Sequence, residues 1–462
     1  MPAERVRIER TPPVRGRVRV PGSKSLTNRA LVAAALAEGT STIRGGLAGD
    51  DAESMVDGLR RLGARIDVAS DVSGDGGLGK TGASWEVTGT RGAVGHTGQA
   101  EAIRVDANLA GTTLRFLTAV AALGQGGITV TGRRGLLDRP VGDLLVALRA
   151  CGAEVAGSGP EGDRPPVRIG RRRKPLGGRV SVDASRSSQF VSALLLVAPC
   201  FDEDLDLEVR GLSAEGFVAL TLDVMAHFGA PVERTTVGYL ARGGTGYRGA
   251  DYEVPPDASA AAHIATLALA TGGQVTIESL SRARSQPDHG FLELAQAAGA
   301  GIVDEPDGSV TVHGPSRLEP FEADLTGMPD ELPNAAALAA LANGTSRICG
   351  VGITRFHESD RMAAVAAELA KVGVRAEIEG DDVVVHGGSP HGGAVLSSHD
   401  DHRMAMALAA LAGAVGDCAL EGADAVSKTY RDFWDDAVRL GLRTAEGAGD
   451  RSPSRERCKS GE

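Results

Sequence analysis

A turn near the start of the chain carries the first residues that could bind a charged ligand. Lys24 and Ser25 follow a Pro-Gly pair and precede an Ala- and Leu-rich run that predicts a helix over 26–37. They therefore lie at a helix N-terminus, where unpaired backbone N–H groups and the helix dipole favour an anion. Arg29 lies one helical turn beyond Ser25, on the same face. This turn predicts an anion site that offers an ammonium, a guanidinium and hydroxyl groups.

Further basic residues stand at or near the junctions of predicted elements. In a chain with a formal net charge of −11, such positions indicate a local site for two anionic groups, for example a phosphate and a carboxylate. Arg would bind these groups with paired hydrogen bonds, and Lys would act as a point charge. For Arg115 taken alone, a surface salt bridge is the simpler interpretation. The residues are Arg115, Arg139, Arg361, Arg403 and Lys428.

Two carboxylates are candidates for proton transfer. Asp330 lies in Pro-Asp-Glu-Leu-Pro at the start of an Ala-rich run, and Glu358 lies in His-Glu-Ser-Asp-Arg. The alternatives are that Asp330 caps a helix and that Glu358 is an exposed acid at a helix start. Near several Lys and Arg residues both carboxylates should stay ionised, so a role in proton transfer requires a closed, drier site.

Other kinds of site find less support in the sequence. The run 22–25 lacks the glycine spacing of a nucleotide-binding P-loop. The run 399–402, His-Asp-Asp-His, resembles metal ligands, but no second ligand set stands at a recognisable spacing. The five cysteines are scattered without a Cys-x-x-Cys pair, which is typical of reduced thiols. We therefore expect no metal and no cofactor.

The amino-acid composition argues against nucleic acids and other polyanions as binding partners. The acidic net charge argues against general binding of polyanions, and an aromatic content of 3% argues against base-stacking surfaces. Residues 1–10 form no apolar signal segment, and no run of 18 apolar residues occurs. We expect a cytoplasmic protein that binds small molecules, with the basic run 171–174 as a solvated loop.

A repeated unit must position these residues. Ala-rich helices are predicted after six turns of small, hydroxyl-bearing or acidic residues, at 23–25, 111–113, 187–189, 257–259, 329–331 and 400–402. A second helix ends near a glycine suited to the C′ position in each unit, at Gly63, Gly152, Gly229, Gly299, Gly373 and Gly441. Each unit reads as strand, turn, buried helix, strand, amphipathic helix and strand, so six copies predict an α/β protein.

The positions of the units predict two domains. Three units precede about residue 240 and three follow it, with 243–256 as the expected crossover. We assign 22–252 to a first domain, 1–21 plus 253–445 to a second, and 446–462 to a disordered tail because it is rich in Gly, Ser and charge. A cleft between such domains is a common place for a small-molecule site.

Eight runs in the chain resemble those of the enolpyruvylshikimate-phosphate synthase family. They cover about residues 14 to 440 and are specific as a set. The resemblance implies a two-domain inside-out α/β barrel of six βαβαββ-type units, three in each domain. The runs are Pro-Gly-Ser-Lys-Ser-Leu-Thr-Asn-Arg (21–29), Ala-Gly-Thr-Thr-Leu-Arg (110–115), Asp-Arg-Pro-Val (138–141), Ser-Ser-Gln-Phe (187–190), Asp330, Glu-Ser-Asp-Arg (358–361), Asp-His-Arg-Met-Ala (401–405) and Ser-Lys-Thr (427–429).

The resemblance also implies an activity and residue roles. The enolpyruvyl group of phosphoenolpyruvate would pass to the 5-hydroxyl of shikimate 3-phosphate through a tetrahedral intermediate that loses phosphate, in a monomer. Glu358 would protonate C3 and Asp330 would act as base, assisted by Lys24. Phosphoenolpyruvate would contact Lys24, Gly111, Arg139, Gln189, Arg361, Arg403 and Lys428. Shikimate 3-phosphate would contact Lys24, Ser25, Arg29, Ser187, Ser188, Gln189, Asp330 and His357.

Three departures from the family pattern leave alternatives open. His357 stands where Lys is frequent, Phe217 stands where Tyr is common, and Asn108-Leu109 replaces a short polar pattern. These changes are compatible with a lineage variant, with a relaxed paralogue, or with a ligand-binding protein that has lost catalysis. The sister enzyme that acts on a UDP-amino sugar would carry Lys-Asn in the first turn and a Cys near Arg139, whereas this chain has Ser25 and its Cys151 lies well past that loop.

Overall fold

The sheets of the protein repeat one pattern of strand pairing. The structure is a computed structural model that describes residues 4–70, 82–95, 102–212, 214–281 and 286–445; the predicted tail at 446–462 lies outside these ranges. In the described ranges, five four-stranded sheets each contain one parallel pair extended by two antiparallel strands. A sixth sheet has the parallel pair and one antiparallel strand.

The strands of the first three sheets all come from residues 40–253. Short alternating sequences such as Ile-Thr-Val-Thr in β8 form them, with every second side chain in the core. The sheets are β16 (Asp251–Glu253), β4 (Thr40–Gly46), β6 (Ala83–Thr88) and β5 (Arg65–Ser70); β7 (Ile103–Asp106), β8 (Ile128–Thr131), β10 (Arg164–Ile169) and β9 (Val155–Ser158); and β11 (Gly178–Asp183), β12 (Leu205–Arg210), β14 (Gly238–Ala241) and β13 (Glu233–Arg234).

The other three sheets use the N-terminal strands and the second half of the chain. They are β2 (Arg15–Val18), β17 (Gln274–Ile277), β19 (Val310–His313) and β18 (Gly301–Asp304); β20 (Glu322–Asp324), β21 (Thr345–Cys349), β23 (Asp382–His386) and β22 (Arg375–Glu379); and β24 (Val395–Ser397), β25 (Cys418–Glu421) and β1 (Arg5–Ile8). A small parallel pair, β15 (Tyr247–Arg248) with β3 (Ala37–Glu38), completes the described sheets.

Six helices are buried almost all round, because their sequences are apolar or small on every face. Ala and Leu dominate them, and in α8 every residue from Ala258 to Leu269 is buried. Three lie in the first half of the chain, α1 (Lys24–Leu36), α3 (Gly111–Ala121) and α6 (Gln189–Val197), and three in the second, α8 (Ala258–Thr271), α10 (Leu332–Leu341) and α12 (His402–Val415).

Amphipathic helices alternate with the buried ones along the chain. Helix α2 buries Ala52, Met55 and Leu59 and turns most of its charged residues outward, whereas Asp51 is buried. The set is α2 (Asp50–Arg61), α5 (Gly142–Ala150), α7 (Glu215–His227), α9 (Phe291–Ala297), α11 (Arg361–Lys371) and α13 (Phe433–Leu440). Helix α4 (Arg134–Leu137) is a single short turn. None of the helices within the described ranges is long and apolar enough to cross a membrane.

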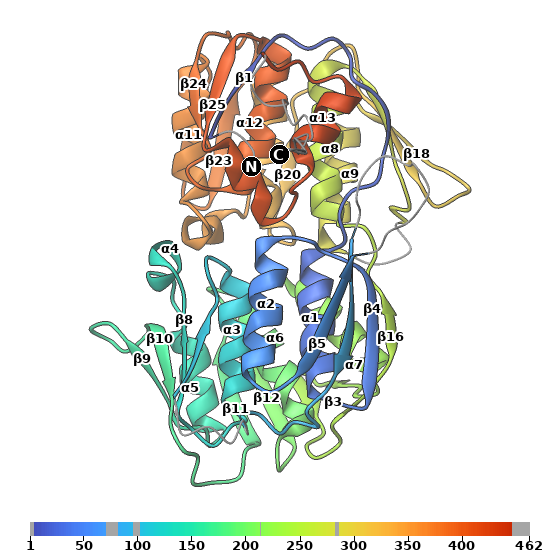
Figure 1. The fold of residues 1–462 in the computed structure, drawn as a ribbon. Helices are drawn as coiled ribbons and strands as arrows, with labels where there is room; N and C mark the ends of the chain where they lie inside the picture. Colours follow the sequence, from blue (N-terminus) through green and yellow to red (C-terminus); the bar gives the residue numbers. More distant parts are fainter. Residues whose placement is uncertain (1–3, 71–81, 96–101, 213, 282–285, 446–462) are drawn as a thin grey trace, which may run out of the picture.

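The buried residues form two separate hydrophobic cores. One contains residues between Leu26 and Val254, and the other contains residues between Val6 and Val20 together with those between Ala260 and Leu442. We call the corresponding parts the first and second lobes. Figure 1 shows them stacked end to end, with the first described strand, β1, and the last described helix, α13, both in the second lobe.

The chain passes between the lobes twice, at adjacent positions. Gly22 and Pro256 form an antiparallel bridge, and the amide of Ser23 donates to the carbonyl oxygen of Pro255 at 2.9 Å. The expected crossover at 243–256 was too long, because residues 247–253 pair with β3 and β4 and so belong to the first lobe. The crossing therefore lies beside the start of α1, the helix that carries Lys24.

Candidate active site

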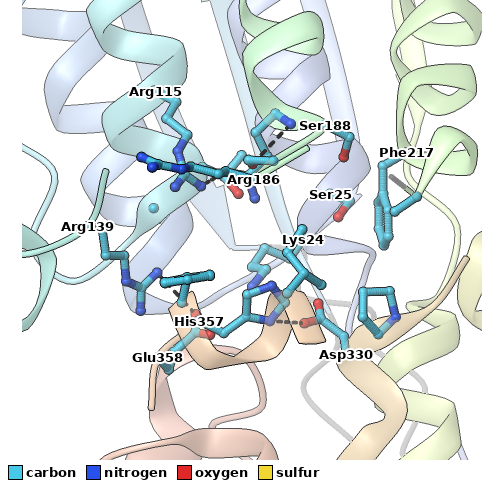
Figure 2. Close-up of a pocket in the computed structure, with 18 of the residues that line it drawn as sticks. Lys24, Ser25, Arg115, Arg139, Arg186, Ser188, Phe217, Asp330, His357 and Glu358 are labelled. Carbon is cyan, nitrogen blue, oxygen red and sulfur yellow. Dashed lines mark hydrogen bonds and ion pairs between the residues drawn. The ribbon is translucent and has the colours of Figure 1, made fainter. Parts of the chain in front are cut away.

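A pocket between the two lobes gathers most of the residues that the sequence singled out. Helices α1, α3 and α6 present their first residues to it, and the second lobe contributes the turns η3 (Pro329–Glu331) and η4 (Gly352–Phe356) with the segment that follows. The pocket is shown in Figure 2. Eleven predicted site residues line it: Lys24, Ser25, Arg29, Gly111, Arg139, Ser187, Ser188, Gln189, Asp330, His357 and Glu358.

The remaining three predicted residues lie behind the second-lobe wall of the pocket. Arg361, Arg403 and Lys428 are buried and contact the carboxylates of Asp330 and Glu358. The charge of each of these three residues therefore acts on the pocket through an ion pair with Asp330 or Glu358. Some of the predicted phosphoenolpyruvate contacts therefore line the pocket, and Arg361, Arg403 and Lys428 lie behind the lining residues.

Asp330 is held by two arginines and a histidine. Its Oδ1 lies 2.6 Å from Nη1 of Arg361 and 3.1 Å from Nδ1 of His357, and its Oδ2 lies 3.0 Å from Nη2 of Arg403. The alternative that Asp330 caps the following helix is wrong, because Glu331 occupies the N-cap position of α10 and no side chain caps it. The carboxylate is instead directed at the cleft.

Glu358 is held by three cations from both lobes. Its Oε1 accepts a hydrogen bond from Nζ of Lys428 at 2.8 Å and lies 3.8 Å from Nη1 of Arg139, and its Oε2 accepts from Nη2 of Arg361 at 3.0 Å. Only 14% of its side chain is exposed. The alternative of an exposed acid at a helix start is therefore wrong; Asp360 caps α11 instead, through the amide of Ala363.

Arg361 joins the two carboxylates to a third. It is completely buried, and Asp401 accepts hydrogen bonds from its Nε at 2.8 Å and from its Nη2 at 3.2 Å. Burial lowers the pKa of Arg361, but Asp401, Asp330 and Glu358 outweigh this effect and raise it. Arg361 is therefore a permanent cation that fixes the spacing of Asp330 and Glu358.

The surrounding cations keep both candidate acid–base groups ionised. Burial alone would raise the pKa of Asp330, but Arg403 and Arg361, with His357, hold it well below its usual range. Burial has the same effect on Glu358, whose pKa is held well below normal by Lys428, Arg139 and Arg361. In this state Asp330 can accept a proton, whereas Glu358 must first gain one before it can donate.

On the first-lobe wall, the glycine at position 111 lets Arg139 lie close to the start of α3. A Cβ atom at Gly111 would lie 2.8 Å from Nη1 of Arg139, so the guanidinium rests against the start of α3. Arg115 is buried, donates to Oε1 of Gln189 at 2.5 Å and stacks over the Phe190 ring. A surface salt bridge is therefore the wrong interpretation of Arg115.

The side chain of Lys24 is more available to a ligand than that of Arg29. Nζ of Lys24 lies 3.6 Å from Oδ2 of Asp51, at the mouth of the pocket. Arg29 is buried, and its guanidinium already donates to Thr221, Ser192 and the carbonyl oxygens of Ser25 and Phe217. Its donors are therefore largely committed to the protein, and it supports the floor of the pocket.

The metal-like run does not form a cluster. Asp401 pairs with Arg361, and His399 lies 2.8 Å from Glu368. His402 is buried, and burial, Lys428 and Lys24 hold its pKa well below normal, so its imidazole is neutral. Within the ranges that the structure describes, no group of three or more His, Cys, Asp or Glu side chains is placed to hold a metal ion.

Several pocket residues escaped sequence reasoning. The sequence around Asp51 is that of an ordinary acidic residue in the first turn of a helix, here α2. Arg186 directly precedes Ser187, in a turn whose hydroxyl groups were predicted to bind substrate. Ala214, Ile353 and Phe356 also line the pocket. Of these, only Arg186 carried a usable signal, because it adjoins a predicted substrate-binding run.

The chain matches known proteins over nearly its whole length. The family model described as EPSP synthase (3-phosphoshikimate 1-carboxyvinyltransferase) matches residues 8–437. A protein named 3-phosphoshikimate 1-carboxyvinyltransferase from Methanoculleus marisnigri is 37% identical over 440 residues, which cover 95% of this chain and 99% of that protein. One of the same name from Methanopyrus kandleri is 39% identical over 442 residues, with coverage of 95% and 99%.

The fold is also similar to a solved structure. An EPSP synthase from Acinetobacter baumannii superimposes with a TM-score of 0.77 at 24% identity and covers 96% of this chain and 99% of its own. At this identity the similarity concerns the mixed α/β fold alone.

Proposed function

The chain belongs to the EPSP synthase (3-phosphoshikimate 1-carboxyvinyltransferase) family, and we propose that the pocket between its lobes is where it performs that reaction. The enzyme transfers the enolpyruvyl group of phosphoenolpyruvate to the 5-hydroxyl of shikimate 3-phosphate and releases phosphate, a step of the shikimate pathway toward chorismate and aromatic amino acids. The observation that carries the proposal is the placement of Asp330 and Glu358 in one pocket, joined by Arg361 and facing Lys24.

Phosphoenolpyruvate fits the side of the pocket where Arg139 and Glu358 meet. Its phosphate and carboxylate would bind cations that now form ion pairs with carboxylates of the protein. These cations are Lys428 and Arg139, which pair with Glu358, and Arg403, which pairs with Asp330. The start of α3 at Gly111 lies against Arg139 and offers backbone N–H groups. Gln189, tied to Arg115, borders both substrates.

Shikimate 3-phosphate fits the side of the pocket that carries hydroxyl groups. Ser25, Ser187 and Ser188, which line the pocket, would bind its phosphate and hydroxyls, and His357 and Asp330 would meet it from the second lobe. Lys24 stands at the start of α1 within reach of both sides. We assign Arg29 a supporting role at this subsite, because most of its donors are used within the protein.

Binding of phosphoenolpyruvate would prepare Glu358 to act as an acid. The pKa of Glu358 is low because Lys428, Arg139 and Arg361 outweigh its burial. An incoming phosphate and carboxylate would draw these cations away and add negative charge beside Glu358, and both changes raise its pKa. The substrate therefore favours protonation of the carboxyl group that must donate to it.

The chemistry then follows in two steps. Glu358 gives its proton to C3 of the enolpyruvyl group while Asp330 removes the proton of the 5-hydroxyl, and the hydroxyl oxygen bonds to C2. The tetrahedral intermediate next loses its phosphate by cleavage of the bond between C2 and oxygen, and the Glu358 carboxylate recovers a proton from C3. The departing phosphate takes the proton that Asp330 removed from the hydroxyl, so Asp330 is again a carboxylate. Lys24, Arg139 and Lys428 stabilise the leaving phosphate.

We also propose the finer architecture and the state of the enzyme. The two lobes correspond to domains 22–252 and 1–21 plus 253–445, each with three βαβαββ-type units in an inside-out α/β barrel. The separate cores, the repeated strand pairing and the buried helices support this division. We propose that the enzyme acts as a monomer in the cytoplasm.

An assay of phosphate release tests the proposed function. Release from phosphoenolpyruvate should require shikimate 3-phosphate and should not occur with a UDP-amino sugar as acceptor. Turnover with the UDP-amino sugar would favour the sister enzyme instead. The absence of turnover with shikimate 3-phosphate would favour a ligand-binding protein and would refute the proposal.

A further inference from the structure

The two walls of the pocket differ in how their positive charges are balanced. Behind the second-lobe wall, Arg361, Arg403 and Lys428 each lie within 3.0 Å of a carboxylate oxygen. On the first-lobe wall, Arg115 and Arg186 have no carboxylate within ion-pair distance among the described residues. Asp143 and Asp183 interact with Arg186 only through electrostatic attraction at longer range. Arg115 and Arg186 therefore carry positive charge that no described carboxylate balances by direct contact, and Glu358 attracts Arg115 only at longer range.

Arg115 holds part of this charge in a buried position. Its side chain is 7% exposed, and its buried Nε has no hydrogen-bond partner in the described part of the chain. Burial and the neighbouring Arg139 lower its pKa to about 9. A buried cation without a counter-ion is costly, so an anion bound at this wall would relieve it.

Arg186 is the exposed member of this wall and adjoins two hydroxyl groups. It directly precedes Ser187 and Ser188, both buried, which lead into α6. Figure 2 shows Arg186 on the same wall as Arg115 and Ser188, across the pocket from His357 and Asp330. A guanidinium beside two hydroxyls and a helix N-terminus matches the geometry of a phosphate group.

The other walls of this subsite offer little competing charge. Ala214 and Phe217 line it from the first lobe and Ile353 from the second, and none of them can pair with an anion. His357 is engaged with Asp330 at 3.1 Å, and Arg29 is committed to Thr221 and to main-chain carbonyls. Among the described residues that line the pocket, Arg186 is therefore a cation on the hydroxyl-bearing side whose guanidinium makes no hydrogen bond or ion pair within the protein.

We propose that Arg186 binds the phosphate group of the acceptor and makes the enzyme select a phosphorylated cyclohexene acid over its unphosphorylated counterpart. This inference rests on the proposed function for the identity of the acceptor. It adds a residue that sets specificity: Arg186 discriminates between acceptors through one charge-assisted contact, while phosphoenolpyruvate binds elsewhere in the pocket.

The test compares shikimate 3-phosphate with shikimate, which lacks the phosphate. Calorimetry with wild type and Arg186→Gln should give about tenfold weaker binding of shikimate 3-phosphate in the variant, as expected for one lost charge-assisted contact. Binding of shikimate should stay the same. Arg186→Lys should recover part of the loss, and the KM for phosphoenolpyruvate should not change.

Arg179→Gln is the matched control. Arg179 lies on β11, seven residues before Arg186, and its exposed side chain pairs with Asp206 outside the pocket. It should leave the binding of both acceptors unchanged. An Arg186→Gln variant that binds shikimate 3-phosphate as wild type does, or that loses affinity for both acceptors equally, would overturn the inference. Failure of the wild type to turn over would instead refute the proposed function, since the binding measurement does not depend on turnover.

Discussion

Nζ of Lys428 lies 2.8 Å from Oε1 of Glu358, two residues that are 70 positions apart in the chain. The pair joins a cation proposed to bind phosphoenolpyruvate to the carboxyl group proposed to protonate it. In the absence of substrate each group neutralises the other. The substrate must therefore separate the pair, and this separation links binding to the protonation of Glu358.

Glu358→Gln should lower kcat by at least about tenfold, a loss of roughly 1.4 kcal/mol of transition-state stabilisation. Glutamine keeps the shape of the side chain but cannot give its proton to C3. Steady-state kinetics with both substrates at saturation measure the effect. A variant with the kcat of wild type would exclude Glu358 as the acid.

Asp330→Asn should lower kcat by about a hundredfold, as expected for the loss of a general base. The amide oxygen can still accept a hydrogen bond from one of the two arginines, Arg361 or Arg403, so the KM for shikimate 3-phosphate should change less than kcat. Measurement of kcat and KM separately checks this. A large rise in KM at normal kcat would mean that Asp330 only binds the acceptor.

Lys24→Ala should raise the KM for both substrates by about tenfold each, because a charge-assisted contact to either ligand is lost. Lys174→Ala, in an exposed basic run of the same lobe, is the control and should change neither. An unchanged KM for phosphoenolpyruvate in Lys24→Ala would contradict the shared position of this residue.

Gly111→Ala should weaken phosphoenolpyruvate selectively. The added Cβ would lie 2.8 Å from Nη1 of Arg139, so the guanidinium must move away from the start of α3. We expect the KM for phosphoenolpyruvate to rise by about fivefold or more while the KM for shikimate 3-phosphate stays the same. Equal rises for both substrates would point to a general distortion of the pocket instead.

Asp401→Asn should destabilise the protein by about 3 kcal/mol, because it removes a buried partner of Arg361. Burial raises the pKa of Asp401, but Arg361 outweighs burial and lowers it. This carboxylate therefore stabilises the fold above its unfolded pKa of about 4, and the contribution is lost as the pH falls through the lower folded value.

Thermal unfolding measured across the acidic range checks the effect of Asp401. The melting temperature of Asp401→Asn should fall less steeply than that of wild type below about pH 4, since the variant lacks one of the groups that titrate there. Asp206→Asn, at a surface pair with Arg179, should behave as wild type. Parallel curves for wild type and Asp401→Asn would contradict the assignment.

The repeat and the pocket turns could be predicted from sequence for a physical reason. A buried helix needs small or apolar residues on every side, and a turn aimed at a ligand needs short polar residues and glycine, so both leave local signals. These signals indicated that Lys24, Gly111 and Gln189 lie at helix N-termini. The turns that contain them were expected to precede the helices, whereas α1, α3 and α6 begin at these residues.

The pairing of charges could not be predicted, because it depends on contacts between distant segments. Nothing local distinguishes Arg115, which is buried against Phe190, from Arg179, which lies on the surface. The ion pairs of Glu358 likewise join segments that meet only after folding. The crossover was misplaced because residues 247–253 are short strands in a Gly-rich segment that reads as a linker.

The most direct test of the account follows the carbon skeleton of phosphoenolpyruvate labelled with carbon-13 at C2. Incubation with shikimate 3-phosphate should give a product in which the labelled carbon is bonded through oxygen to C5 of the acceptor and retains its vinyl group, with one phosphate released for each ether formed. Nuclear magnetic resonance identifies that carbon. Labelled pyruvate, or unchanged phosphoenolpyruvate, would contradict the account.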